Sequence, residues 1–193
     1  MSKLRARKIK LLLFDVDGVM TDGKLWFLPV SFLPTSAEGG VATTSRIEAK
    51  GFHAHDGIGV SLARLGGLKT GLITKRTSET VALRARDLKL DYAYQGATVK
   101  IKVFEEILGK EKITAAQAAY IGDDIIDLPI MRRCGFAIAV ANARHEVKQE
   151  AHWVTPHAGG DGAVRDAVEY ILKAQGSWDS VVKQYLERGE GPQ

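Results

Sequence analysis

The chain has 193 residues, of which 45% are hydrophobic and 26% charged, and its formal charge at pH 7 is +4. This composition is typical of a soluble globular domain, because it is too apolar for a disordered chain and too often interrupted by charge for a membrane span. Residues 1 to 10 hold five basic side chains and no acid, which leaves 22 basic and 23 acidic residues in the rest of the chain and excludes a broadly basic, nucleic-acid-binding body.

Two features of the sequence indicate the compartment. The apolar run after the basic start ends at Asp15, before it reaches the roughly 7 to 15 residues of a secretory h-region. We therefore expect a buried strand that follows a solvated, frayed basic tail. Cys134 is the single cysteine, which excludes an internal disulfide framework and favours a reducing compartment. We expect a cytoplasmic protein without nucleic-acid or membrane partners.

Short apolar runs alternate with helix-length segments from residue 9 onward. Strands are predicted at 9 to 14, 68 to 73, 92 to 94, 118 to 121 and 136 to 140, and helices at about 57 to 65, 77 to 89, 98 to 108, 125 to 133 and 162 to 174. Such alternation is typical of βαβ units. The pattern predicts one α/β domain over residues 1 to 193, with a doubly wound, mainly parallel, Rossmann-like sheet. Residues 176 to 193 are expected to form a C-terminal tail.

The segment from residue 24 to 55 does not follow this alternation. It contains Trp26, Phe27 and Phe32 together with prolines, glycines and a Thr/Ser cluster, which favour neither a helix nor a tight loop. Two strands, near 24 to 28 and 45 to 53, would form a hairpin inserted after the first strand. Its apolar side chains are better explained by a partner subunit than by solvent. Packing onto the hairpin's own sheet is the alternative.

Acidic residues gather where two of the predicted strands end. Asp15 and Asp17 follow the first strand, and Asp123 and Asp124 follow the strand at 118 to 121. Ligands bind at the carboxyl ends of strands in a doubly wound sheet, so these acids are expected to meet there. Carboxylates brought this close together repel one another unless a cation lies between them. A hard divalent ion with oxygen ligands, Mg²⁺ above all, satisfies this requirement.

The same residue types suit phosphoryl transfer. One carboxylate of the Asp15–Asp17 pair can attack phosphorus and form an aspartyl-phosphate, while the other moves protons. Thr74 and Lys100, each next to the end of a strand or the start of a helix, can provide a hydroxyl donor and a positive charge for the phosphoryl oxygens.

Seven motifs resemble the haloacid dehalogenase (HAD) superfamily, over residues 9 to about 174. They are D-V-D-G-V-x-T-D-G, F-H-x-x-D-G-x-G, I-T-x-R, Y-Q-G, Y-I-G-D-D-x-x-D-x-P-x-M, A-V-A-N-A and G-G-x-G-A-V-R-D. Together they are similar to the capless branch typified by 3-deoxy-D-manno-octulosonate 8-phosphate phosphatase. The resemblance implies a Mg²⁺-dependent phosphatase without a cap domain, acting on a phosphorylated sugar acid. It also implies lipopolysaccharide biosynthesis and a homotetramer in which the hairpin and a neighbour's C-terminal segment help to close each site.

The resemblance also implies a role for individual residues. Asp15 matches the nucleophile, which is also a metal ligand, and Asp17 matches the general acid/base, which also binds the metal through its backbone carbonyl. Asp123 matches the remaining side-chain ligand, and Asp124 an acid next to the ligands that does not itself bind the metal. Thr74 and Lys100 match the residues that hold the phosphoryl oxygens. The positions that match the family's substrate contacts are His53, Ala54, His55, Asp56, Gly57, Arg76, Arg84 and Lys100.

The chain departs from the family pattern at three positions. His55 and Ser61 replace residues that are commonly basic, and Lys75 stands where I-T-G-R is usual. An Arg presents a planar fork to a carboxylate that a His does not reproduce, so these changes bear on the substrate more than on the chemistry. The same chemistry on a nonulosonate 9-phosphate or another small phosphate ester is the runner-up.

Three other interpretations of the sequence were considered. A non-catalytic oligomerisation module of the same fold would also explain His55 and Lys75. A signalling receiver domain is disfavoured, because its phosphoacceptor ends the third strand, where this chain reads Tyr94-Gln95-Gly96. A zinc site at His53 and His55 lacks a third ligand in the sequence. Arg76 and Arg84 are expected to share one helix face, where pairing with Glu79 or Asp87 is the alternative to substrate binding.

Overall fold

Six parallel strands form the central sheet of the computed structural model, which describes residues 1–29 and 46–188. The spatial order is β5-β4-β1-β6-β7-β8, and every neighbouring pair is parallel. The strands are β1 (Leu11–Phe14), β4 (Lys69–Ile73), β5 (Tyr92–Tyr94), β6 (Ala118–Gly122), β7 (Phe136–Ala139) and β8 (Trp153–Val154). The sheet runs outward from β1 in both directions, which confirms the predicted doubly wound α/β architecture.

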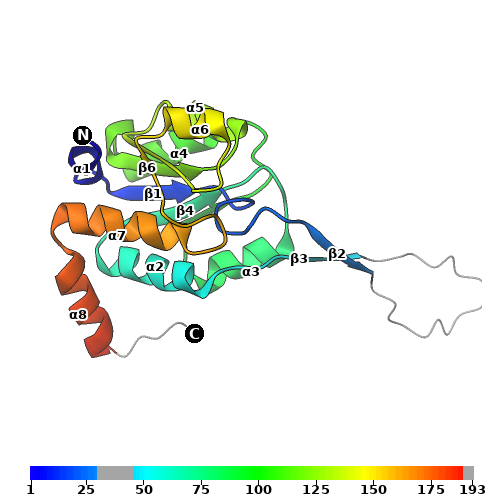
Figure 1. The fold of residues 1–193 in the computed structure, drawn as a ribbon, viewed down its shortest axis with the longest axis horizontal. Coiled ribbons are helices and arrows are strands. Elements are labelled where there is room, and N and C mark those ends of the chain that lie inside the picture. The colour runs from blue at the N-terminus through cyan, green and yellow to red at the C-terminus, as the bar shows by residue number, and fades with distance from the viewer. Residues whose placement is uncertain (30–45, 189–193) are drawn as a thin grey trace, which may run out of the picture.

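Helices cover both faces of this sheet. Figure 1 shows α2, α3 and α7 on one face and α4, α5 and α6 on the other. The helical elements are α1 (Ser2–Ala6), α2 (Ala54–Leu65), α3 (Glu79–Asp87), α4 (Lys100–Glu111), η1 (Ala115–Gln117), η2 (Ile125–Asp127), α5 (Leu128–Met131), α6 (His145–Glu150), α7 (Ala163–Gln175) and α8 (Trp178–Arg188). The helix predicted at 125 to 133 is instead the 3₁₀ turn η2 followed by the short α5.

The core lies between the sheet and the two helix layers. All four residues of β1 and all five of β6 are buried, as expected for strands covered on both faces. Helix α7 buries one face, including Val164, Val168 and Ile171, and packs on α2. The ends of β1 and β6 lie side by side because all four residues of β1 pair with the first four residues of β6.

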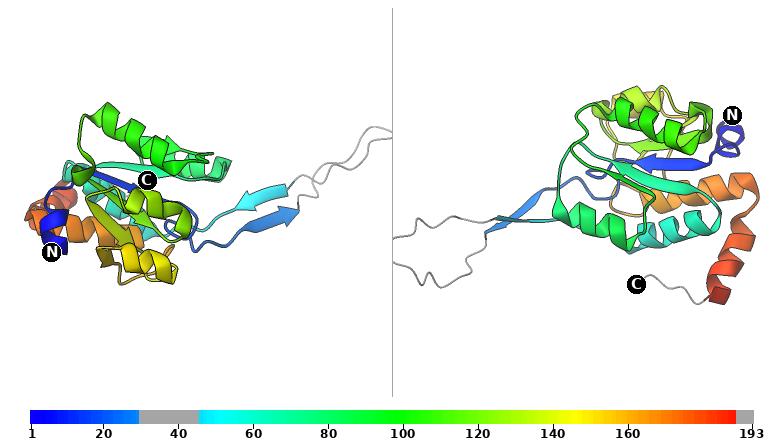
Figure 2. Two further views of the ribbon diagram at one scale, coloured as in Figure 1. Left: turned by 90° about the horizontal axis from the view of Figure 1, so that it is seen from above. Right: turned by 180° about the vertical axis from the view of Figure 1, so that it is seen from behind.

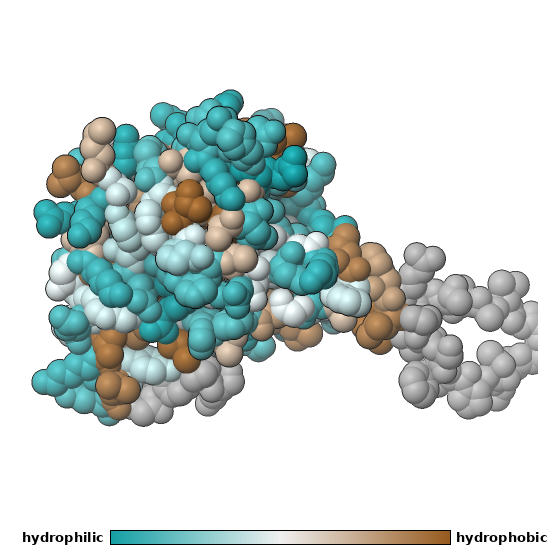
Figure 3. All heavy atoms as spheres, in the orientation of Figure 1, coloured by the Kyte–Doolittle hydropathy of each residue, from teal (hydrophilic) through white to brown (hydrophobic). Residues whose placement is uncertain are grey.

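The predicted hairpin is present in the described residues. Strands β2 (Trp26–Pro29) and β3 (Arg46–Ala49) pair antiparallel and extend away from the body in both views of Figure 2. Residues 30 to 45 of the predicted insertion lie outside the described residues. The space-filling view in Figure 3 shows apolar surface on this hairpin, where Trp26, Phe27, Leu28 and Ile47 are each more than half exposed.

Both ends of the described chain differ from the expected tails. The start is not frayed: helix α1 buries Ala6, while Arg5 donates to the Gly135 carbonyl and Arg7 to the Ala174 carbonyl, each at 3.0 Å. The segment from residue 176 includes helix α8, which packs on α2 and α7. Among the described residues, the helices are all too short or too polar to cross a membrane.

Candidate active site

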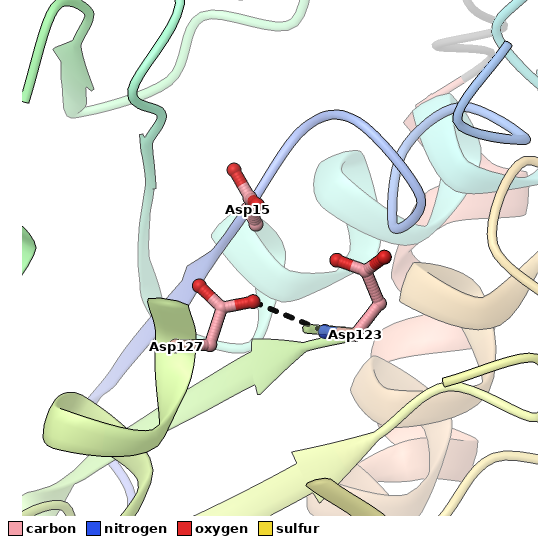
Figure 4. A group of neighbouring side chains, drawn as sticks. All are labelled: Asp15, Asp123 and Asp127. Carbon is pink, nitrogen blue, oxygen red and sulfur yellow. Dashed lines mark hydrogen bonds between the residues drawn. The ribbon is translucent and has the colours of Figure 1, made fainter. Parts of the chain in front are cut away.

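The two acidic clusters meet at the carboxyl ends of β1 and β6. The Asp15 side chain follows β1, and those of Asp123 and Asp127 follow β6 (Figure 4). Each of these three residues offers a carboxylate oxygen, and the three oxygens lie within 4.8 Å of one another. The strand order reverses between β1 and β6, because β4 and β5 lie on one side of β1, and β6, β7 and β8 on the other. Ligands bind at this position in doubly wound folds.

Lys100 is the buried cation of this cluster. It is the first residue of α4, and its Nζ lies 2.8 Å from Asp15 Oδ2 and 2.8 Å from Asp127 Oδ1. Burial alone would lower the pKa of the Lys100 ammonium, but Asp127 and Asp15 outweigh that effect and raise it. Lys100 therefore stays charged beside Asp15.

Asp127 is a member of this cluster for which no role was expected from the sequence. Its Oδ1 accepts hydrogen bonds from Lys100 Nζ and from the Tyr120 hydroxyl, both at 2.8 Å. Its Oδ2 accepts from the backbone N–H of Asp123 at 3.1 Å, as drawn in Figure 4, and from that of Asp124 at 3.4 Å. Both oxygens are thus engaged by the protein, so Asp127 orients Lys100 and the turn that carries Asp123. The signal for it was the third acid of G-D-D-x-x-D.

The electrostatics of the cluster fit a divalent cation. Burial is the main cause, and repulsion from Asp127 the second, of a rise in the pKa of Asp15 to about 6, which occurs despite the nearby Lys100. Burial and the charges of Asp127 and Asp15 raise the pKa of Asp123 to about 7. Asp123 Oδ1 is buried without a hydrogen-bond partner among the described residues. Three carboxylates against one ammonium, with an unpaired oxygen, are a donor set suited to a hard ion such as Mg²⁺.

The turn after β1 depends on Gly18. Its φ of +90° lies in the region that favours glycine, and a Cβ there would lie 2.1 Å from Asp123 Oδ2. The two acidic clusters approach this closely only because residue 18 has no side chain.

Asp17 lies apart from the three-carboxylate cluster, with three charged neighbours. Its Oδ1 is bonded to the Lys50 ammonium, and its Oδ2 lies 3.6 Å from Arg76 Nε. Glu48 Oε1 in turn lies 3.3 Å from Lys50 Nζ and 2.9 Å from Arg76 Nη2. Glu48 lies in the hairpin strand β3 and Lys50 directly after it, and neither residue was predicted from the sequence to be part of the site.

A cavity of about 340 Å³ joins these groups. It is lined by Asp15, Asp17, Gly23, Thr74, Lys75, Arg76, Asp123, Asp124 and Ile126. Thr74, directly after β4, is buried there, and Asp124 is exposed and accepts the Ile125 backbone N–H. Five of the residues singled out from the sequence for catalysis or metal binding thus surround one space, with Lys100 behind Asp15.

Arg76 and Arg84 do not share a helix face, contrary to the expectation. Helix α3 begins at Glu79, so Arg76 lies in the preceding loop, where its acidic neighbours are Glu48 and Asp17 rather than Glu79 or Asp87. Arg84 lies inside α3 against the Phe52 ring, with its buried Nε unpaired in the part of the chain that is described.

The stretch from His53 to Gly57 forms the start of α2 and lies against the start of α7. Asp56 is buried, and its Oδ1 accepts the Arg165 backbone N–H at 2.9 Å, while burial raises its pKa to about 6. His53 caps α2, and Ala54 is its exposed first residue. His55 lines a second cavity, of about 330 Å³, with Asp161 and Arg165 among its other lining residues. Substrate contact by this stretch stays a prediction.

Comparison with known proteins gives consistent matches. The model of the haloacid dehalogenase-like hydrolase family matches residues 88–167. The 3-deoxy-D-manno-octulosonate 8-phosphate phosphatase KdsC of Escherichia coli K12 is 35% identical over 182 residues, which cover 94% of this chain and 89% of that protein.

Two solved structures extend the similarity to three dimensions. The 3-deoxy-D-manno-octulosonate 8-phosphate phosphatase of Yersinia pestis has a TM-score of 0.80 at 35% identity and covers 92% of this chain and 88% of its own. The enzyme of the same name from Moraxella catarrhalis, solved in complex with a magnesium ion, a phosphate ion and a KDO molecule, has a TM-score of 0.83 at 32% identity, covering 95% of this chain and 97% of its own.

Proposed function

We propose that this chain hydrolyses the sugar-acid phosphate 3-deoxy-D-manno-octulosonate 8-phosphate. The chain belongs to the haloacid dehalogenase-like hydrolases and, among them, to the capless family of 3-deoxy-D-manno-octulosonate 8-phosphate phosphatases. It is a HAD-type phosphatase, and in residues 1–29 and 46–188 its body carries a hairpin but no cap domain. The observation that carries the proposal is the convergence of Asp15, Lys100 and Asp123 at the ends of adjacent strands.

The arrangement supports a two-step displacement at phosphorus. Asp15 attacks the phosphorus atom, the bond to the sugar oxygen breaks, and Asp17 gives a proton to that oxygen, which leaves as the alcohol. Asp17 then takes a proton from water, the resulting hydroxide attacks the aspartyl-phosphate, and Asp15 and inorganic phosphate are released. Lys100 and Thr74 hold the phosphoryl oxygens, and Lys100 also fixes Asp15 by its 2.8 Å contact.

Mg²⁺ is the cofactor that we propose for this site. Asp15 and Asp123 would hold it through side-chain oxygens and Asp17 through its backbone carbonyl. Asp124 would lie next to these ligands without binding the ion itself. When bound, the ion neutralises charge on the phosphoryl group and on the clustered carboxylates. Asp127 is a less suitable ligand, because four protein donors already engage its two oxygens.

The sugar-acid substrate is supported by the cationic edge of the cavity. Lys75 and Arg76 line it beside Asp17, and Arg76 is partly exposed, so its guanidinium can exchange Glu48 for a substrate carboxylate. The relatives at 35% identity carry the name of this activity. His55 at the start of α2 is the main departure, and it favours keeping a nonulosonate 9-phosphate as the second candidate.

We extend the proposal to assembly and cellular role. The half-exposed side chains of the hairpin suit burial against other copies of the chain, and we propose a homotetramer. A role in lipopolysaccharide biosynthesis in the cytoplasm accompanies the proposed substrate.

A panel of phosphate esters tests the substrate. Purified protein with Mg²⁺ is assayed for phosphate release from 3-deoxy-D-manno-octulosonate 8-phosphate, a nonulosonate 9-phosphate, glycerol 2-phosphate and 4-nitrophenyl phosphate. We expect kcat/KM to be highest for the octulosonate ester. If that ester is no better than glycerol 2-phosphate, the proposed substrate is wrong. Without Mg²⁺-dependent hydrolysis of any ester, the non-catalytic module becomes the better interpretation.

A further inference from the structure

The hairpin brings charged as well as apolar side chains to the body of the protein. Glu48 lies in β3, and Lys50 follows it by two residues, so both side chains point to the same side of the extended chain. The Lys50 side chain is 0% exposed and that of Glu48 17% exposed, whereas Ile47, the residue before Glu48, is 54% exposed. The charged side of β3 is therefore directed at Asp17, in the turn after β1, and not at solvent.

The two oxygens of Asp17 face two different cations. Lys50 occupies Oδ1, and Arg76 lies 3.6 Å from Oδ2, beyond hydrogen-bond distance. Glu48 contacts both cations and thereby balances the charge of the group. The carboxylate of Asp17 thus has one firmly bonded oxygen and one loosely contacted oxygen.

The two cations also differ in their freedom to leave. The Arg76 side chain is 41% exposed and lines the cavity, so a bound substrate can draw it away from Asp17. The buried Lys50 ammonium has carboxylate partners only in Asp17 and Glu48 among the described residues. Withdrawing from Asp17 would leave a buried charge with half of its compensation, which is strongly unfavourable.

We propose that Lys50 is a positioning residue that fixes the Asp17 carboxyl group for proton transfer, with Glu48 holding Lys50 in place. Because the ammonium occupies Oδ1, Oδ2 is the oxygen left to exchange a proton with a substrate in the cavity that Asp17 lines. The ammonium also stabilises the carboxylate that forms when the proton goes to the leaving oxygen. This inference rests on the proposed phosphatase function and makes the hairpin part of the acid/base machinery.

The leaving group provides the test. An alkyl ester needs a proton on its departing oxygen, whereas 4-nitrophenolate departs without one, so misplacing the general acid slows the first ester more. The Lys50→Met variant removes the charge and keeps most of the stem. We expect its kcat/KM to fall about 100-fold for 3-deoxy-D-manno-octulosonate 8-phosphate and less than about tenfold for 4-nitrophenyl phosphate. Asp17→Asn should show the same selectivity, and Lys50→Arg should recover most of the alkyl-ester activity.

Lys24→Met is the matched control, because Lys24 is an exposed lysine at the start of the same hairpin, and it should behave as the wild type. An equal fall for both esters in Lys50→Met, or no fall, would overturn the proposal. Crystal structures of the wild type and Lys50→Met give a second readout that does not depend on activity. We expect the Asp17 carboxyl group to move away from its wild-type position, and an unchanged position overturns the inference. Wild-type protein that hydrolyses neither ester contradicts the proposed function instead, and the crystal structures still decide the role of Lys50.

Discussion

At the scale of the residue, the site depends on one buried ammonium. Lys100 lies between Asp15 and Asp127 at 2.8 Å from each, and all three side chains are almost inaccessible to water. A buried charge that loses its partner cannot recover the energy of hydration, so each member of this group depends on the others. Lys100 consequently contributes to folding as well as to the proposed chemistry.

Replacing Lys100 should therefore destabilise the fold. For Lys100→Met at pH 7 without added metal, we expect the free energy of unfolding in urea to fall by about 3 kcal/mol, because two buried carboxylates lose their cation. Phosphatase activity should fall below detection in the same variant. Lys110→Met, in the same helix but half exposed, is the control and should leave the free energy of unfolding nearly unchanged. A loss as small as that of the control would show that Asp15 and Asp127 do not need Lys100.

The residues that the sequence identified are those placed by strand ends. Asp15 and Asp123 directly follow β1 and β6, so knowing that both strands are buried and parallel was enough to bring them together. Asp127 depends instead on the 3₁₀ turn η2, which points its carboxylate back at Lys100. Lys50 depends on how the hairpin leaves the body. Neither geometry follows from residue spacing, so both residues were recognised only in the structure.

At the level of the secondary-structure element, the hairpin would serve both of the roles that we propose for it, subunit contact and positioning of Asp17. Its apolar residues occupy both faces of a two-stranded ribbon, which is marginally stable by itself in water. Burial between subunits would stabilise the ribbon and at the same time fix Glu48 and Lys50 beside Asp17. The proposed assembly and the proposed acid/base step are thus linked through one element.

A charge on the hairpin should disrupt the assembly. Leu28 pairs with Ile47 across the two strands, and both side chains are more than half exposed. We expect Leu28→Glu to lower the mass measured by sedimentation from that of a tetramer toward that of a monomer, because a carboxylate would be buried without a partner. Leu83→Glu, at a similarly exposed leucine in α3, should keep the wild-type mass. The same mass for both variants would exclude the hairpin as the subunit contact.

Helices and strands with strong periodicity were predictable, and those that depend on distant partners were not. The five predicted strands of the sheet all exist, whereas the two-residue β8 offers too short an apolar run to be recognised. Helix α1 was missed because its basic side chains suggest a solvated tail, yet Arg5 and Arg7 bind carbonyl groups 130 and 167 residues away in the chain. Contacts of this range leave no local signal.

At the scale of the whole molecule, the position of charge matters more than its sum. The formal charge of +4 reflects the basic start of the chain, part of which docks on the body as α1. The site itself has an excess of carboxylates, which meet where the chain crosses from one half of the sheet to the other. A cation and a phosphate between these acids and the basic residues Lys100, Lys75 and Arg76 complete the charge balance.

We propose that Asp15 is the nucleophile of a Mg²⁺-dependent phosphatase, and the Asp15→Asn variant tests this role. Phosphate release from 4-nitrophenyl phosphate is measured with Mg²⁺ for the wild type and for the variant, with circular dichroism to show that both are folded. We predict Mg²⁺-dependent turnover by the wild type and a loss of at least about 10⁴-fold in the folded variant, because the amide cannot form the aspartyl-phosphate. Turnover by Asp15→Asn near the wild-type rate would show that Asp15 is not the nucleophile.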